Sequence, residues 1–131
     1  MSVIKITTEK PIQEFNINGE MYQVRYDDEA LVEYERKALE FHAVTQKKLN
    51  KNADTKEVKK YENTMKSAIK DVMDTFFGEG SYDKIYESTG RSHLAMITVV
   101  EGLHDWLKEK TTVKSNKITD YYTKWLYEID W

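Results

Sequence analysis

The stretch FFGEGSYDKIYESTG, residues 76–90, interrupts the helical pattern of the chain and decides how its helices are joined. Gly78 and Gly80 follow an apolar helical stripe, and glycine is the residue that most readily ends a helix and redirects the chain. A Walker phosphate-binding loop is excluded, because it needs four residues between its glycines and a preceding strand. The dinucleotide fingerprint lacks its third glycine. We therefore interpret this stretch as a hinge, followed by a short helix that Ser81 is expected to cap and that runs through Glu87.

Two long helices are predicted before the hinge. Asp27 and Asp28 suit the start of the first, since their carboxylates match the unpaired amides and the positive end of the helix dipole. Its apolar stripe continues to about Leu49. Asp54, with Glu57 three residues later, resembles a capping box and begins the second helix. Two long helices joined by a short polar loop predict an antiparallel helical hairpin.

After the hinge, Gly90 suits a left-handed position and Ser92 suits the cap of a further helix. Residues 108–117, KEKTTVKSNK, are polar and are predicted to form a linker. Apolar residues then recur at helical spacing to the end of the chain. We accordingly divide the chain into a β-hairpin plus helical domain, 1–110, and a linker with a C-terminal amphipathic helix, 111–131.

The clearest strand signal lies in IQEFNINGEMYQVRY, residues 12–26. Asn18 and Gly19 form the pair favoured in a two-residue hairpin turn, where both residues need positive φ. A lone hairpin is barely stable in water, so we expect it to pack on helices or to pair with a neighbouring subunit. The fold class predicted from all these elements is mainly α, a helical domain with a short N-terminal β-hairpin.

Composition excludes several classes of function. The 131 residues include no cysteine, which excludes thiolate chemistry and cysteine-based zinc sites. The net charge of −3 provides no broad positive field, so nucleic-acid binding is not favoured. The longest apolar piece, LAMITVVEGL, is too short to cross a membrane, and we expect a soluble cytoplasmic protein.

Candidate catalytic and metal-binding residues do not form a recognisable set. His93 and His104 lie eleven residues apart, which places their imidazoles roughly 16 Å apart on a helix, too far for one ion. No serine lies in a nucleophile elbow. We expect no enzymatic activity, cofactor or metal; an enzyme with a carboxylate pair stays open as an alternative that needs a concave pocket.

A second alternative is a small helical regulatory or nucleic-acid-binding protein. Six lysines cluster around the predicted loop between the two long helices, and three of them share a helical face. Acidic neighbours dilute their charge, so a solvated loop is the simpler interpretation. The lysines are Lys47, Lys48, Lys51, Lys56, Lys59 and Lys60.

The order of elements and one motif resemble the tail assembly chaperones of long-tailed bacteriophages and related prophage elements. The order is a short hairpin, FNINGEMYQVRYDD, two long helices, the hinge FGEGSYDKIYESTGRS and a closing helix. The motif F-G-x-x-x-Y-D-x-I-Y, residues 77–86, resembles a stretch found in phages of Gram-positive bacteria. The resemblance covers about residues 13–107, and residues 111–131 depart from it.

The resemblance implies a non-enzymatic protein of the bacterial host cytoplasm that is absent from the finished virion. Its partners would be the tape-measure protein, which it keeps from aggregating, and the tail-tube protein; it would assemble into a homo-oligomer. We expect partner contacts on the short helix and on the final helix, although the short-helix residues also fit a core position and the final helix also fits docking on its own domain. The candidate residues are Tyr82, Ile85, Tyr86, Tyr121, Tyr122, Trp125 and Leu126.

Overall fold

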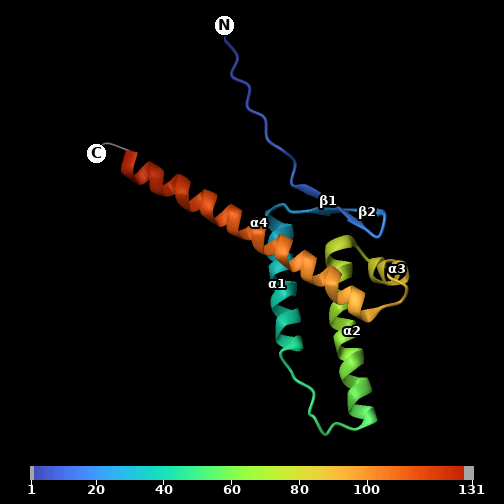
Figure 1. Cartoon of the computed structure of the whole chain (residues 1–131). Helices are drawn as coiled ribbons and strands as arrows, with labels where there is room; N and C mark the ends of the chain where they lie inside the picture. The colour runs from blue at the N-terminus through green and yellow to red at the C-terminus, as the bar shows by residue number, and fades with distance from the viewer. Residues whose placement is uncertain (1, 129–131) are drawn as a thin grey trace.

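The structure, a computed structural model, describes the backbone of residues 2–128 and the side chains of residues 2–124. Within that range an extended segment, residues 2–10, leads into one antiparallel hairpin and then four helices (Figure 1). We call residues 2–10 the N-terminal arm. This arrangement confirms the predicted fold class, mainly α with a short N-terminal β-hairpin.

The hairpin consists of β1 (Ile12–Ile17) and β2 (Glu20–Arg25). Its register pairs Ile17 with Glu20 beside the turn. The turn residues Asn18 and Gly19 have φ of +52° and +91°, which confirms the predicted two-residue turn. Alternate side chains of both strands face the helices, so the hairpin is stabilised by packing on its own chain.

The two long helices are α1 (Asp28–Thr45) and α2 (Thr55–Phe77). Both predicted caps are present: Asp27 accepts a hydrogen bond from the amide of Ala30 at 2.8 Å, and Asp54 accepts one from Glu57 at 2.8 Å. The prediction that α1 continues to Leu49 is wrong. Past Thr45 the chain leaves the core and Leu49 is exposed, so no packing offsets the entropy cost of further helical residues.

The hinge separates α2 from α3 (Ser81–Ser88) and α4 (His93–Glu128). Gly78, Gly80 and Gly90 all have positive φ, as a hinge between helices requires. The amide of Ala95 donates to the hydroxyl of Ser92 at 3.1 Å, which confirms the cap before α4. Ser81 does not cap α3; it is the buried first residue of that helix, and Gly80 precedes it.

The predicted linker at residues 108–117 is instead part of α4, so this prediction is wrong. The segment contains no glycine or proline, and polar residues are what an exposed stretch of helix requires. Its side chains also hold it to the body: Lys114 forms an ion pair with Asp28 at 2.8 Å. Beyond this contact α4 projects clear of the other elements (Figure 1).

The core lies where α4 crosses α1 and α2, beneath the hairpin and beside α3 (Figure 1). Tyr34 stacks on Phe76 with ring centroids 4.2 Å apart, and its hydroxyl donates to the carbonyl of Arg25 at 2.7 Å. This contact joins α1, α2 and β2. None of the described helices has the combination of length and apolarity that a membrane crossing requires.

Candidate functional site

The short helix α3 presents little surface for a partner. Tyr82 is 9 % exposed and Ile85 is 0 % exposed, so both belong to the core. Burial raises the pKa of the Tyr82 phenol, and its ring stacks on Tyr86 at 5.8 Å. Tyr86 is half-buried and lies beneath the guanidinium of Arg91. The sequence allowed these three residues to lie either in the core or at a partner contact. Tyr82 and Ile85 lie in the core.

The second half of α4 carries an exposed apolar surface. Ile118, Tyr121 and Tyr122 are 48 %, 54 % and 63 % exposed. The rings of Tyr121 and Tyr122 contact each other with centroids 5.5 Å apart. The side chains of Trp125 and Leu126 lie outside the described residues, although their backbone belongs to α4. We call Ile118, Tyr121 and Tyr122 the tail stripe.

The tail stripe continues the face by which α4 packs on the core. Ile118 follows the buried Val100 by 18 residues, and Tyr121 follows the buried Leu103 by 18. Eighteen residues make five helical turns, so each pair shares one face about 27 Å apart along the axis. The same apolar pattern is thus buried in the first half of α4 and exposed in the second.

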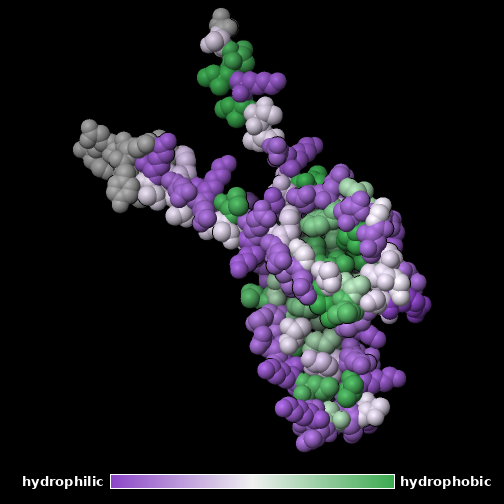
Figure 2. Space-filling view, viewed as in Figure 1, coloured by the Kyte–Doolittle hydropathy of each residue, from purple (hydrophilic) through white to green (hydrophobic). Residues whose placement is uncertain are grey.

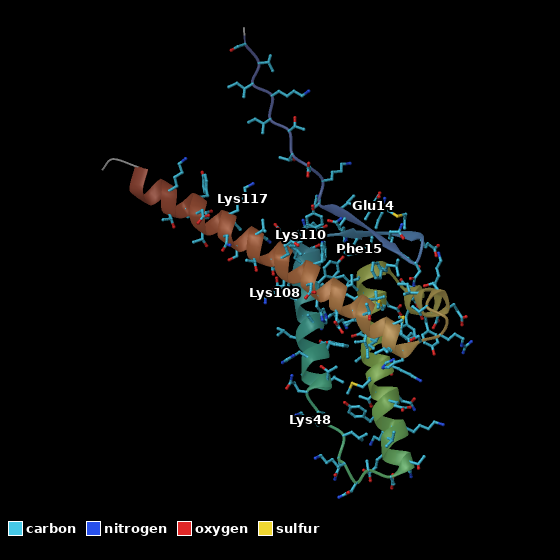
Figure 3. The ribbon with its side chains drawn as sticks, in the orientation of Figure 1. Glu14, Phe15, Lys48, Lys108, Lys110 and Lys117 are labelled. Atoms are coloured by element: carbon cyan, nitrogen blue, oxygen red, sulfur yellow. The ribbon has the colours of Figure 1, made fainter. Side chains whose placement is uncertain are left out.

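Polar contacts separate the two halves of this face. Lys110 lies over the ring of Tyr26 at 5.1 Å, and Lys114 pairs with Asp28. These two lysines hold the middle of α4 against the start of α1 and the residues just before it. Lys108, Lys110 and Lys117 label this part of the helix in Figure 3.

A basic groove lies at the opposite end of the molecule, between α1 and α2. Its volume is about 740 Å³, and α2 supplies three lysines to it together with several uncharged polar side chains. Asp71 also lines the groove, and its carboxylate accepts from Lys37 at 2.9 Å. The lysines and uncharged polar residues that α2 contributes to the lining are Lys56, Lys59, Lys60, Asn63, Thr64 and Ser67.

Charged residues are unevenly distributed along the chain, which the net charge of −3 does not show. Residues 46–70, at the end with the basic groove, hold eight lysines and three acidic residues. A chain of net charge −3 therefore has a local charge of +5 at this end and −8 elsewhere. Lys48 and the hairpin residue Glu14 lie at opposite ends of the molecule in Figure 3.

The histidines do not come together. His93 and His104 both lie on α4, and the ring of His104 contacts Phe41 of α1 with centroids 5.3 Å apart. Burial lowers the pKa of His104, an effect that Asp105 partly opposes. In the part of the chain that is described, no three histidine and acidic side chains are grouped closely enough to hold a metal ion.

Sequence reasoning missed the apolar surface of the N-terminal arm. Val3, Ile4 and Ile6 are among the most exposed apolar side chains of the described residues, and the space-filling view shows the arm standing clear of the body (Figure 2). A usable signal was present, since five of residues 3–8 are β-branched, the type enriched in strands.

Comparison with known proteins adds no relative. No protein-family model matches the chain, and neither a curated protein nor a solved structure matches it significantly.

Proposed function

We propose that this protein is a non-enzymatic, protein-binding assembly factor, and specifically a tail assembly chaperone of a long-tailed bacteriophage or prophage. In this proposal it binds the tape-measure protein and helps recruit tail-tube subunits in the host cytoplasm, and it leaves before the virion is finished. The observation that carries the protein-binding part of the proposal is the tail stripe: one helix buries its apolar face in the core and then presents the same face to solvent. The specific family is proposed from the motif at residues 77–86 and the order of elements.

The energetics of such a surface suit a chaperone. Apolar burial stabilises a complex by about 25 cal/mol per Å², whereas association costs several kcal/mol in lost freedom. A surface as small as the tail stripe of Ile118, Tyr121 and Tyr122 therefore binds a client weakly. Several copies assembled along one long helical client bind it together by avidity, and each contact still releases readily.

The test is co-purification with the tape-measure protein of the same phage or prophage. The double variant Tyr121→Ser/Tyr122→Ser should lose co-purification, because both rings are exposed and their loss leaves the core intact. The matched control is Val32→Ser/Leu39→Ser, which removes two exposed apolar side chains from α1 and should retain binding. Equal retention by both variants would contradict the proposal, provided that circular dichroism shows both to be folded.

A second candidate function, nucleic-acid binding, is favoured by the basic groove. Lys56, Lys59 and Lys60 line one wall together with polar side chains that can donate to phosphate oxygens. The groove lies far from the tail stripe, so the two functions are separable by variants at either end.

A further inference from the structure

The outer edge of β1 is unoccupied by any other described strand. Among residues 2–128, β1 pairs with β2 along one edge, and the two strands form the entire sheet. An open strand edge presents amide and carbonyl groups that readily pair with another extended segment. A two-stranded sheet also gains stability from a third strand.

A groove runs beside that edge and is hollowed to receive side chains. It has a volume of about 310 Å³ and lies between β1 and the first half of α4. Its lining includes Asn16 and Ile17 from β1, with no residue of β2, so it adjoins the outer edge. Val99 and Leu103 supply apolar surface from α4.

Gly102 makes the room in this groove. Glycine is disfavoured inside a helix, yet Gly102 lies in the middle of the core-packing half of α4. A Cβ added at this position would meet no atom within 4 Å, so the missing side chain leaves open space beside β1. The groove fits an extended segment that directs alternate apolar side chains toward α4.

The N-terminal arm has the pattern of such a segment. Ile4 and Ile6 project to one side of an extended chain and Lys5 to the other. Ile4 and Ile6 are 85 % and 84 % exposed, so nearly all of their apolar surface faces solvent. The arm leaves the start of β1 in the direction away from the helices (Figure 1), and the carbonyl of Pro11 accepts from Tyr26 at 2.7 Å to hold this junction.

We propose that the arm of one copy adds as a third strand to the outer edge of β1 in a second copy. Arm residues 2–7 match the six residues of β1 in length. With Lys5 opposite Glu14, the outward face carries a pair of opposite charges, a favourable cross-strand pairing in either strand direction. Ile4 and Ile6 then lie opposite Gln13 and Phe15, whose side chains face α4, and the isoleucine opposite Phe15 enters the groove beside Gly102 (Figure 3 shows Glu14 and Phe15).

This inference deepens the proposed function, because it rests on the multimeric form of the chaperone and names the contact that builds it. The tail stripe takes no part in it. Failure of the arm contact is therefore distinguishable from failure of client binding, which is measured on Tyr121 and Tyr122.

The experiment compares the self-association of full-length variants by sedimentation velocity. Ile4→Asp/Ile6→Asp should raise the dissociation constant by about 100-fold, because two buried apolar side chains are replaced by charges. Val3→Asp/Thr7→Asp places the same charges on the opposite face of the arm and should associate far more tightly than the first variant. Gly102→Leu fills the groove at a position with free space and should be as monomeric as the first variant.

Mixing is the decisive measurement. Ile4→Asp/Ile6→Asp retains an open groove and Gly102→Leu retains an intact arm, so an equimolar mixture of the two should form a heterodimer although each alone is monomeric. A cysteine-free chain also allows a direct check of register: a copy with Lys5→Cys should form a disulfide with a copy that carries Glu14→Cys.

Three results would overturn the arm contact: a monomeric wild-type protein, equal dissociation by both arm variants, or a mixture that stays monomeric. A monomeric wild type would also remove the multimeric part of the proposed function. The other two results would leave that function standing.

Discussion

At the scale of single residues, Gly78 shows how one backbone conformation ends a helix. Its φ and ψ of +103° and 159° lie in a region that is essentially restricted to glycine. The residue follows Phe77, the last residue of α2, and its amide still donates to the carbonyl of Asp74 at 3.0 Å. The side-chain carboxylate of Asp74 also accepts from the amide of Tyr82 at 3.1 Å, so the backbone and the side chain of one residue hold the turn and the start of α3.

We predict that Gly78→Ala lowers the free energy of unfolding by about 1–3 kcal/mol, because alanine is strained at this φ and ψ. Gly102→Ala is the matched control: Gly102 is helical with free space at Cβ, so this change should raise the free energy of unfolding by about 0.5–1 kcal/mol. Urea denaturation followed by circular dichroism measures both. Equal effects of the two substitutions would contradict a conformational role for Gly78.

At the scale of elements, α4 has two parts with different environments. Its first half packs on α1 and α2, and its second half extends into solvent past Lys114. A side chain at the interface between α1 and α4 illustrates the difference. His104 lies against Phe41 and beside Ala38, with its ring desolvated, and desolvation disfavours the charged imidazolium.

The packing of α1 on α4 should therefore weaken at acidic pH. Because burial lowers the pKa of His104 in the folded state, the unfolded chain binds a proton first as the pH falls through about 6.5. The stability contribution of neutral His104 is complete above that pH and is lost as the pH falls toward the folded-state pKa. We predict that His104→Leu reduces the loss of unfolding free energy between pH 7.5 and pH 5.

Urea denaturation at the two pH values measures this effect. His42→Leu is the control, since His42 is exposed on α1 and should retain the wild-type pH dependence. An unchanged pH dependence in His104→Leu would show that another group is responsible.

At the scale of the whole molecule, the dominant feature is the separation of charge between the two ends. The basic groove lies at the free end of the α1–α2 hairpin, and most of the acidic excess lies in residues 26–45 and 71–92. Such a separation creates a local positive potential although the chain is acidic overall. The net charge of the whole chain therefore does not describe the charge at this end.

We predict salt-dependent binding of duplex DNA at this end, and its loss in Lys56→Glu/Lys59→Glu/Lys60→Glu. Three phosphate contacts contribute a slope of about −3 to the plot of log affinity against log salt, and the variant should remove it. Fluorescence anisotropy at several salt concentrations measures the slope. The control variant replaces Lys5, Lys10 and Lys117 with glutamate. These lysines lie outside the groove, so the control should bind DNA as the wild type does. If the wild-type protein does not bind duplex DNA, the second candidate function is wrong.

The features that could be predicted correctly depend on residues close together in the chain. Asn18 and Gly19 specify their turn, Asp27 and Asp54 cap the helices that follow them, and Gly78 ends α2. Each of these conformations is decided by sterics and hydrogen bonds within about four residues, so the sequence contains all the information needed.

The features that escaped prediction depend on residues far apart. The polar composition of residues 108–117 predicts a linker, whereas in the structure they are helical and Lys114 contacts Asp28, which lies 86 residues away in the sequence. The periodicity of α3 did not reveal that Tyr82 and Ile85 face inward, because burial depends on which helix lies opposite. The groove between β1 and Gly102 exists only once α4 has crossed beneath the hairpin. Local conformation follows from neighbours along the chain, whereas burial, exposure and grooves follow from contacts that folding alone creates.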